Sequence, residues 1–202
     1  MSRLSDRVNG LLRRGPTWPL YVLGMVPAGW FLWLGLTGGL GPEPIKALEH
    51  KLGETALQLL IVVLAVTPLR RFTGISLIRF RRALGLLAFA YVALHLATWA
   101  FLDVQSWGRV WADIVKRPYI TIGMAGFVLM LPLALTSNNW SIRRLRANWR
   151  KLHRLTYAIV VLGGVHYVML VKGWQTQPLV YLAVILLLLG LRFQPARRRQ
   201  PA

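Results

Sequence analysis

Histidine is the residue type in this sequence best suited to hold a redox-active metal, and two of the four histidines share one apolar run. The run reads KLHRLTYAIVVLGGVHYVMLVK and carries His153 at its basic end and His166 thirteen residues later. On one helix, at about 1.5 Å of rise per residue, the two imidazoles would stand about 20 Å apart. Ionisable side chains are costly in lipid and normally face the interior of a helix bundle, so this placement indicates a functional site.

The composition indicates a membrane protein with several spans. The chain has 202 residues, of which 55% are hydrophobic and 15% are charged. A net charge of +19 would suggest nucleic acid as a partner of a soluble protein, but here the basic residues form short clusters between apolar runs. That pattern is typical of membrane topology, so we expect the lipid bilayer as a partner and no nucleic acid. The sequence has no cysteine, which excludes disulfides, thiolate-bound iron–sulfur clusters and covalent haem attachment through C-x-x-C-H.

Six apolar runs approach the length of about 20 residues that a crossing helix needs. They cover residues 18–36, 52–69, 83–102, 119–136, 152–171 and 178–193. No alternating strands of barrel type are present, so the sequence predicts an all-α bundle of six transmembrane helices that forms a single domain over residues 1–202. We expect the first run to be a retained span, because the stretch LGLTGGL after it lacks a convincing signal-peptide cleavage site.

Basic residues predict the orientation of this bundle. If six helices alternate, 19 of the 25 basic residues fall on one side, and that side should be cytoplasmic. Five of the six acidic residues fall on the other side. We therefore expect both termini in the cytoplasm and the protein in the inner membrane.

His95 and His166 should face one another in this topology. The runs 83–102 and 152–171 both lead outward, and each histidine lies about thirteen residues from the basic end of its run, at Arg82 and His153 respectively. Two neutral imidazoles at equal depth suit axial ligation of a haem iron between two helices. The alternative is two interior histidines that are hydrogen-bonded to nearby polar groups.

Small residues give this site weak further support. Gly163 and Gly164, just before His166, would leave room for a porphyrin, although small residues also simply let membrane helices pack.

A faint internal repeat bears on His153. Superposing His95 on His166 places Arg82 opposite His153, so an arginine stands where a second histidine would complete an inner pair. Arg81, fourteen residues before His95, falls nearly on the same helical face as that histidine. Either arginine could belong to an inner haem site, as a ligand or as a partner of the propionates. If His153 and His166 face one neighbour, their thirteen-residue spacing requires some unwinding; a solvated interfacial His153 is the alternative.

Several blocks of sequence resemble one family over nearly the whole chain. These are GGLGPEPIKALEHKLGETAL, VTPLRR, LIRFRRALGLLAFAYVALHL, KRPYITIG and WRKLHRLTYAIVVLGGVHY. They resemble the MsrQ family (formerly YedZ), the haem-binding membrane subunits of bacterial protein-methionine-sulfoxide reductase systems, within the ferric-reductase-like transmembrane group.

The resemblance implies one or two b-type haems whose iron is bound by His95, His153 and His166. It implies electron transfer from the quinol pool or a cytosolic flavin reductase to a periplasmic molybdopterin-containing subunit, which holds the sulfoxide-reducing site and repairs oxidised proteins. FMN is a further cofactor that the resemblance implies. The chain differs from the wider group because Arg81 and Arg82 replace the inner histidine, and we expect it to lack the cytosolic FAD/NAD(P)H domain of that group.

Two other classes of function stay open at this stage. A small proton-coupled transporter could use buried histidines as a proton relay, and it would show inverted halves and broken helices. A structural anchor for a partner enzyme would tolerate replacement of every histidine. His50, in an outer connection, is expected to be a surface residue.

Overall fold

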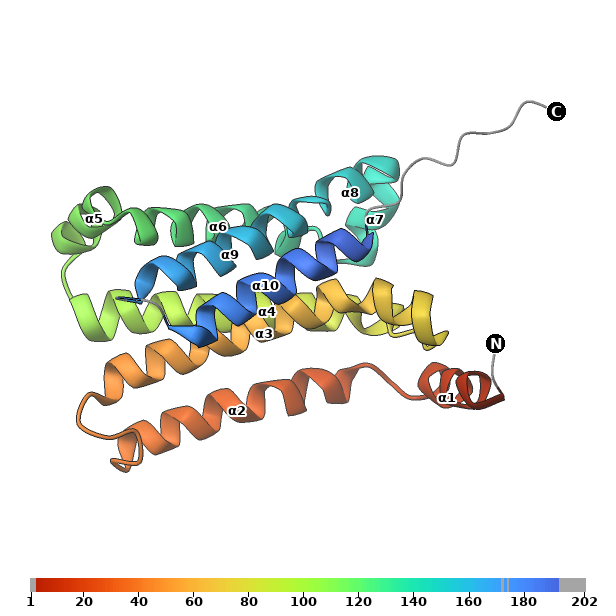
Figure 1. Ribbon diagram of the computed structural model, residues 1–202, viewed down its shortest axis with the longest axis horizontal. Helices are drawn as coiled ribbons and strands as arrows, with labels where there is room; N and C mark the ends of the chain where they lie inside the picture. Colours follow the sequence, from red (N-terminus) through yellow and green to blue (C-terminus); the bar gives the residue numbers. More distant parts are fainter. Residues whose placement is uncertain (1–2, 172, 174, 193–202) are drawn as a thin grey trace.

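The computed structural model describes residues 3–171, 173 and 175–192, and this part of the chain contains helices but no strand (Figure 1). The elements in chain order are α1 (Arg3–Arg14), α2 (Trp18–Leu36), α3 (Pro44–Thr73), the short 3-10 helix η1 (Ile78–Phe80), α4 (Arg81–Ala97), the π-helix η2 (Thr98–Val104), α5 (Trp107–Lys116), α6 (Pro118–Leu135), α7 (Asn139–Leu145), α8 (Ala147–Leu152), α9 (Leu155–Leu170) and α10 (Thr176–Arg192).

Local signals set where these helices begin and end. Prolines stand in the first turn of α2, α3 and α6, where the missing N–H costs no helical hydrogen bond. Helix α3 ends at Gly74, whose φ of 76° is left-handed and whose N–H donates to the Arg70 carbonyl at 3.1 Å. The prolines inside α2, α3 and α6 do not end their helices.

Four stretches of the described chain are long and apolar enough to cross a membrane: Trp18–Leu36, Pro44–Thr73, Ile78–Val104 and Pro118–Leu135. They correspond to the first four predicted spans, and the third is extended by η1 and η2. The last two predicted spans form α9 and α10, which have 16 and 17 residues. Six crossings therefore remain a prediction. The predicted end of the last span, Phe193, lies outside the described residues.

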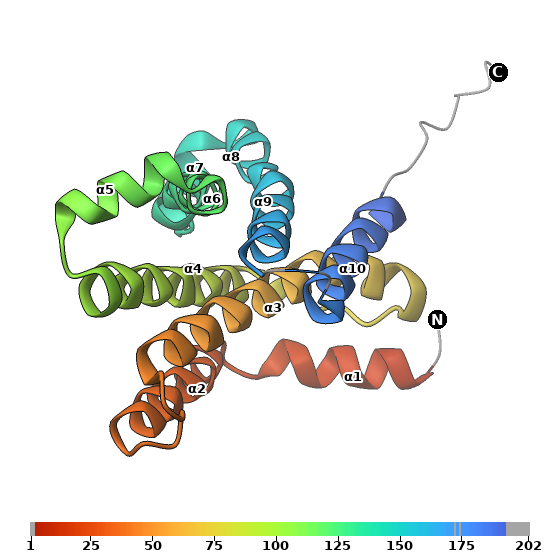
Figure 2. The ribbon, with the colours of Figure 1, turned by 60° about the vertical axis from the view of Figure 1, so that its left-hand side comes forward.

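The inner bundle consists of α3, α4, α6 and α9. Helix α3 packs along α4, and α6 packs along α9, while α10 covers α9 and α3. Figure 2 shows α6 and α9 on one side of α4 and α2 on the opposite side. A core of buried apolar side chains joins α3, α4, α6, α9 and α10, and includes Leu64, Ala88, Met130, Val160 and Ile185.

A buried tyrosine joins α2 to α4 beside Pro27. The Ala28 N–H donates to the Tyr91 hydroxyl at 3.1 Å, and that hydroxyl donates to the Gly24 carbonyl at 2.7 Å. Gly24 and Ala28 are four residues apart and would normally bond each other, so the hydroxyl is inserted into the helical ladder next to the proline. Tyr91 is completely buried.

The two ends of the bundle differ in what they carry. In Figure 1, α1, α7, α8 and the end of α10 lie at the right, whereas α5 and the α2–α3 connection lie at the left. The described part of the chain thus starts and finishes at the same end, the one with most of the arginines. That arrangement agrees with an even number of crossings, while the assignment of this end to the cytoplasm stays a prediction.

One expectation about His153 is wrong. The sequence suggested that a single helix carries His153 and His166, but α8 ends at Leu152, His153 and Arg154 form a turn, and α9 begins at Leu155. The chain is therefore interrupted where the thirteen-residue spacing required unwinding.

Candidate functional site

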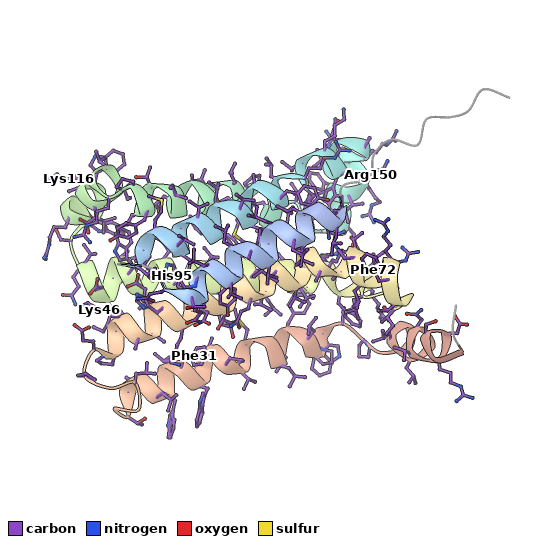
Figure 3. All side chains as sticks on the ribbon, in the orientation of Figure 1. Phe31, Lys46, Phe72, His95, Lys116 and Arg150 are labelled. Carbon is purple, nitrogen blue, oxygen red and sulfur yellow. The ribbon has the colours of Figure 1, made fainter. Side chains whose placement is uncertain are left out.

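A cavity of about 300 Å³ lies between α3, α4, α6 and α9, toward the end of the bundle that carries α5. This volume is at the lower bound of pockets that hold small organic ligands, about 300–1,000 Å³. Figure 3 shows His95 near the end of the bundle at which Lys46 is labelled. The walls are largely apolar, and charged side chains gather at the outer edge: Lys46, Glu49, Glu54, Asp103 and Arg117.

His95, on α4, is held by the backbone of α3. Its Nδ1 lies 2.9 Å from the Glu49 carbonyl oxygen. Because a carbonyl only accepts hydrogen bonds, Nδ1 must carry the proton, and the neutral ring then keeps its lone pair on Nε2. This is the tautomer that a metal-ligating histidine needs, with the second nitrogen bonded to a carbonyl.

His166, on α9, is held in the same way by α6. Its Nδ1 lies 2.7 Å from the Tyr119 carbonyl oxygen, which again fixes the proton on Nδ1. Each histidine therefore receives its acceptor from the helix that precedes its own in the bundle. The two arrangements are copies of one another.

The two rings lie against each other in space, as the topology predicted. Their centroids are 6.2 Å apart and their planes cross at 81°. A metal–imidazole bond of about 2.0 Å, together with about 1.1 Å from Nε2 to the ring centre, places a shared ion about 3.1 Å from each centroid. The observed separation of 6.2 Å is twice that distance, so the spacing of the two rings is compatible with one metal ion between them.

Only part of the predicted glycine contribution belongs to this cavity. Gly163 lines it, as do Gly53, Gly123 and Gly126. Gly164 instead allows α9 to pack closely against α10, because a Cβ there would lie 2.9 Å from Ile185 Cδ1 and 3.2 Å from Leu182 Cδ1. Expected surface residue His50 is exposed, and it stands at the edge of the cavity.

His153 belongs to a second, separate environment at the other end of the bundle. Its Nε2 lies 3.1 Å from the Thr136 hydroxyl, and its ring stacks on Trp149 with centroids 3.9 Å apart. Burial, and then the positive charge of Arg81, lower the pKa of this imidazole, which lies in the turn before α9. A neutral His153 is thereby favoured.

The two arginines predicted opposite His153 behave differently. Arg82 is exposed and donates through Nη1 to the Asn139 side chain at 2.8 Å. Arg81 is partly buried and close enough for its positive charge to lower the pKa of His153. The structure therefore brings Arg81 toward His153, whereas Arg82 is tied to the start of α7.

Sequence reasoning missed the backbone carbonyls that accept from His95 and His166, and it missed a polar cluster beside the cavity. In that cluster, the Glu54 carboxylate accepts from the Tyr181 hydroxyl at 2.9 Å and is also contacted by Gln58 and Gln177. It joins α3 to α10. Backbone carbonyls have no sequence signature, but a glutamate and a glutamine four residues apart inside an apolar helix were a visible signal.

Comparison with known proteins identifies the class to which this fold and site belong. The family model described as "Ferric reductase like transmembrane component" matches residues 52–164. This range holds all of α4 and α6, the larger part of α3 and the first part of α9. It includes His95 and ends two residues before His166. No solved structure matches the chain.

Curated relatives are more specific. The chain is 49% identical over 187 residues to the protein-methionine-sulfoxide reductase heme-binding subunit MsrQ of Brucella anthropi, covering 91% of this chain and 85% of the relative. It is 50% identical over 188 residues to the subunits of the same name from Brucella ovis and Brucella canis, covering 92% of this chain and 86% of each relative. The chain therefore belongs to the ferric-reductase-like transmembrane family and, within it, to the MsrQ haem-binding subunits, which confirms the resemblance.

Proposed function

We propose that this chain is a haem b subunit that carries electrons across the bacterial inner membrane to a periplasmic methionine-sulfoxide reductase subunit. Membership of the MsrQ group supports a membrane electron-transfer role. The observation that carries the proposal is the His95–His166 pair, whose rings are 6.2 Å apart and whose Nδ1 atoms are both bonded to carbonyls. Two rings that line one cavity and keep their Nε2 lone pairs would form a bis-histidine site for haem iron.

The residues of the chain would provide orientation and a largely apolar environment at the site of His95 and His166. The Glu49 and Tyr119 carbonyls hold the two tautomers, and apolar side chains from four helices line the cavity. When bound, haem supplies one-electron redox chemistry. His95 and His166 would both hold the iron, and a haem held by two protein nitrogens favours electron transfer over reaction with small molecules.

An inner haem is the second part of the proposal, with His153 as its ligand. The partly buried Arg81 is the better placed of the two arginines to pair with a propionate, because a protonated guanidinium has no lone pair to offer the iron as a ligand. Arg82 would act from the rim, because Asn139 already accepts a hydrogen bond from it. A chain with one haem would keep the outer site only.

Electrons would enter at the arginine-rich end from the quinol pool or a cytosolic flavin reductase, with FMN as a further cofactor. They would leave at the opposite end toward a periplasmic molybdopterin-containing subunit that reduces methionine sulfoxide in oxidised proteins. The catalytic site would lie on that partner. Connections 40–52 and 103–117, which lie at the α5 end, are the candidate docking surface because they surround the outer edge of the cavity.

The test is a reduced-minus-oxidised visible spectrum of the purified protein together with a count of haem per chain. We expect a low-spin b-type spectrum and one or two haems. A well-folded but colourless protein would refute the proposal. If that colourless protein moved a substrate into liposomes, the transporter interpretation would take its place. The anchor interpretation would be supported if a chain without histidines still sustained activity of the partner.

A further inference from the structure

Each cavity histidine lies against a glycine of the neighbouring helix. A Cβ built on Gly53 would lie 3.0 Å from His95 Nδ1 and 3.2 Å from its Cε1. A Cβ built on Gly123 would lie 2.8 Å from His166 Nδ1 and 3.0 Å from its Cε1. Neither imidazole could keep its present position beside a side chain at these two residues.

The two glycines hold the same position relative to the carbonyls that accept from the histidines. Gly53 is four residues after Glu49, and Gly123 is four residues after Tyr119. In an α-helix the carbonyl of residue i points toward residue i+4. A second donor can reach that carbonyl only beside the Cβ of residue i+4, and glycine leaves this approach open.

The same unit occurs twice in the chain. The carbonyl and its histidine are separated by 46 residues in the α3–α4 pair and by 47 residues in the α6–α9 pair. Both units therefore place a carbonyl and a glycine on the first helix and the histidine on the second. Because the construction recurs at the ligands and uses glycine both times, helix packing alone is a weak explanation for it.

We infer that Gly53 and Gly123 are positioning residues for the outer haem, which set the orientation and the basicity of its two axial histidines. This inference rests on the proposed function. By admitting the Nδ1–H···O=C bonds, the glycines hold the ring planes at 81° to one another. The same bonds increase the electron donation of each ring, which stabilises the oxidised iron and lowers its reduction potential.

The experiment compares Gly123→Ala, Gly53→Ala and a control, Gly29→Ala, in purified full-length protein. Gly29 lies in α2, and a Cβ there meets nothing within 4 Å. Potentiometric titration should show a higher outer-haem potential in Gly123→Ala, a smaller rise in Gly53→Ala and no change in the control. The low-temperature electron paramagnetic resonance signal of the oxidised haem, which reports the angle between the ligand planes, should shift in the same order. A Gly123→Ala protein that matches the control in both measurements would overturn the inference.

A second experiment leaves both glycines intact. In His166→Gly protein, free imidazole can ligate the iron and donate to the Tyr119 carbonyl, whereas 1-methylimidazole can ligate but has no proton to donate. We expect imidazole to restore the low-spin spectrum and the original potential, and 1-methylimidazole to restore neither fully. Equal restoration by both ligands would overturn the inference. Failure of the proposed function is a different result: the wild-type protein itself would then show no bis-histidine haem.

Discussion

The imidazoles of His95 and His166 lie with their centroids 6.2 Å apart although 71 positions separate them in the sequence. They come from α4 and α9. The Nδ1 of His95 is bonded to a carbonyl of α3, and the Nδ1 of His166 to a carbonyl of α6. Four helices therefore meet at one pair of rings. Loss of either ring leaves the other without a partner for a shared metal ion.

Replacement of either cavity histidine should remove the same haem. We expect His95→Ala and His166→Ala each to lower the haem count by one per chain and to abolish the same low-spin signal, because one iron needs both rings. The double variant should lose no more than either single variant. Visible spectra and haem counts of purified proteins check this, with His50→Ala as the control at the exposed edge of the cavity. Additive losses from the two single variants would contradict a shared site.

Replacement of His153 should affect a different haem. Because His153 lies in the turn before α9 and contacts Trp149 and Thr136 rather than the cavity, His153→Ala should leave the outer spectrum unchanged. It should lower the haem count by one per chain where an inner haem is present. Lys151→Ala, an exposed basic residue two positions earlier, serves as the control. A full haem count in His153→Ala protein would show that this histidine is an ordinary interfacial residue.

The two neighbouring arginines should give unequal results. Arg81 is partly buried, and its positive charge helps to lower the pKa of His153. Arg82 is exposed and bonded to Asn139. We expect Arg81→Ala to shift or remove the inner haem signal and Arg82→Ala to leave most of it. Redox titration of the inner signal in the two variants makes the comparison. A larger effect from Arg82→Ala would reverse the assignment.

The pairing of His95 with His166 could be predicted from sequence, because apolar runs and arginine clusters fix which helices run in the same direction. The carbonyls of Glu49 and Tyr119 could not, since every residue has a carbonyl and only the packing shows which one receives an imidazole. The interruption at His153 was signalled indirectly by a spacing that does not fit one face of a continuous helix. The stacking of His153 on Trp149 could not be predicted, because it depends on the geometry of the turn between α8 and α9.

Removal of the Tyr91 hydroxyl should destabilise the protein without touching the haem site. In Tyr91→Phe, the Gly24 carbonyl and the Ala28 N–H beside Pro27 lose their buried partner. A buried polar group without a partner costs about 1–3 kcal/mol, so the thermal unfolding midpoint in detergent should fall. The control is Tyr21→Phe, a partly exposed tyrosine of α2. An unchanged midpoint would mean that Gly24 and Ala28 bond each other once the hydroxyl is gone.

The absence of native cysteine allows a direct test of topology, because an introduced thiol is the only one in the chain. Arg109 on α5 and Arg144 on α7 are exposed and lie at opposite ends of the bundle (Figure 1). A membrane-impermeant maleimide added to intact cells should label Arg109→Cys, whereas Arg144→Cys should react only after the membrane is opened, since the arginine-rich end should be cytoplasmic. Gln175→Cys, just before α10, should behave like Arg109→Cys if α9 crosses the membrane despite its 16 residues. If Gln175→Cys were labelled only in opened cells, α9 would not cross the membrane and the protein would have fewer than six crossings.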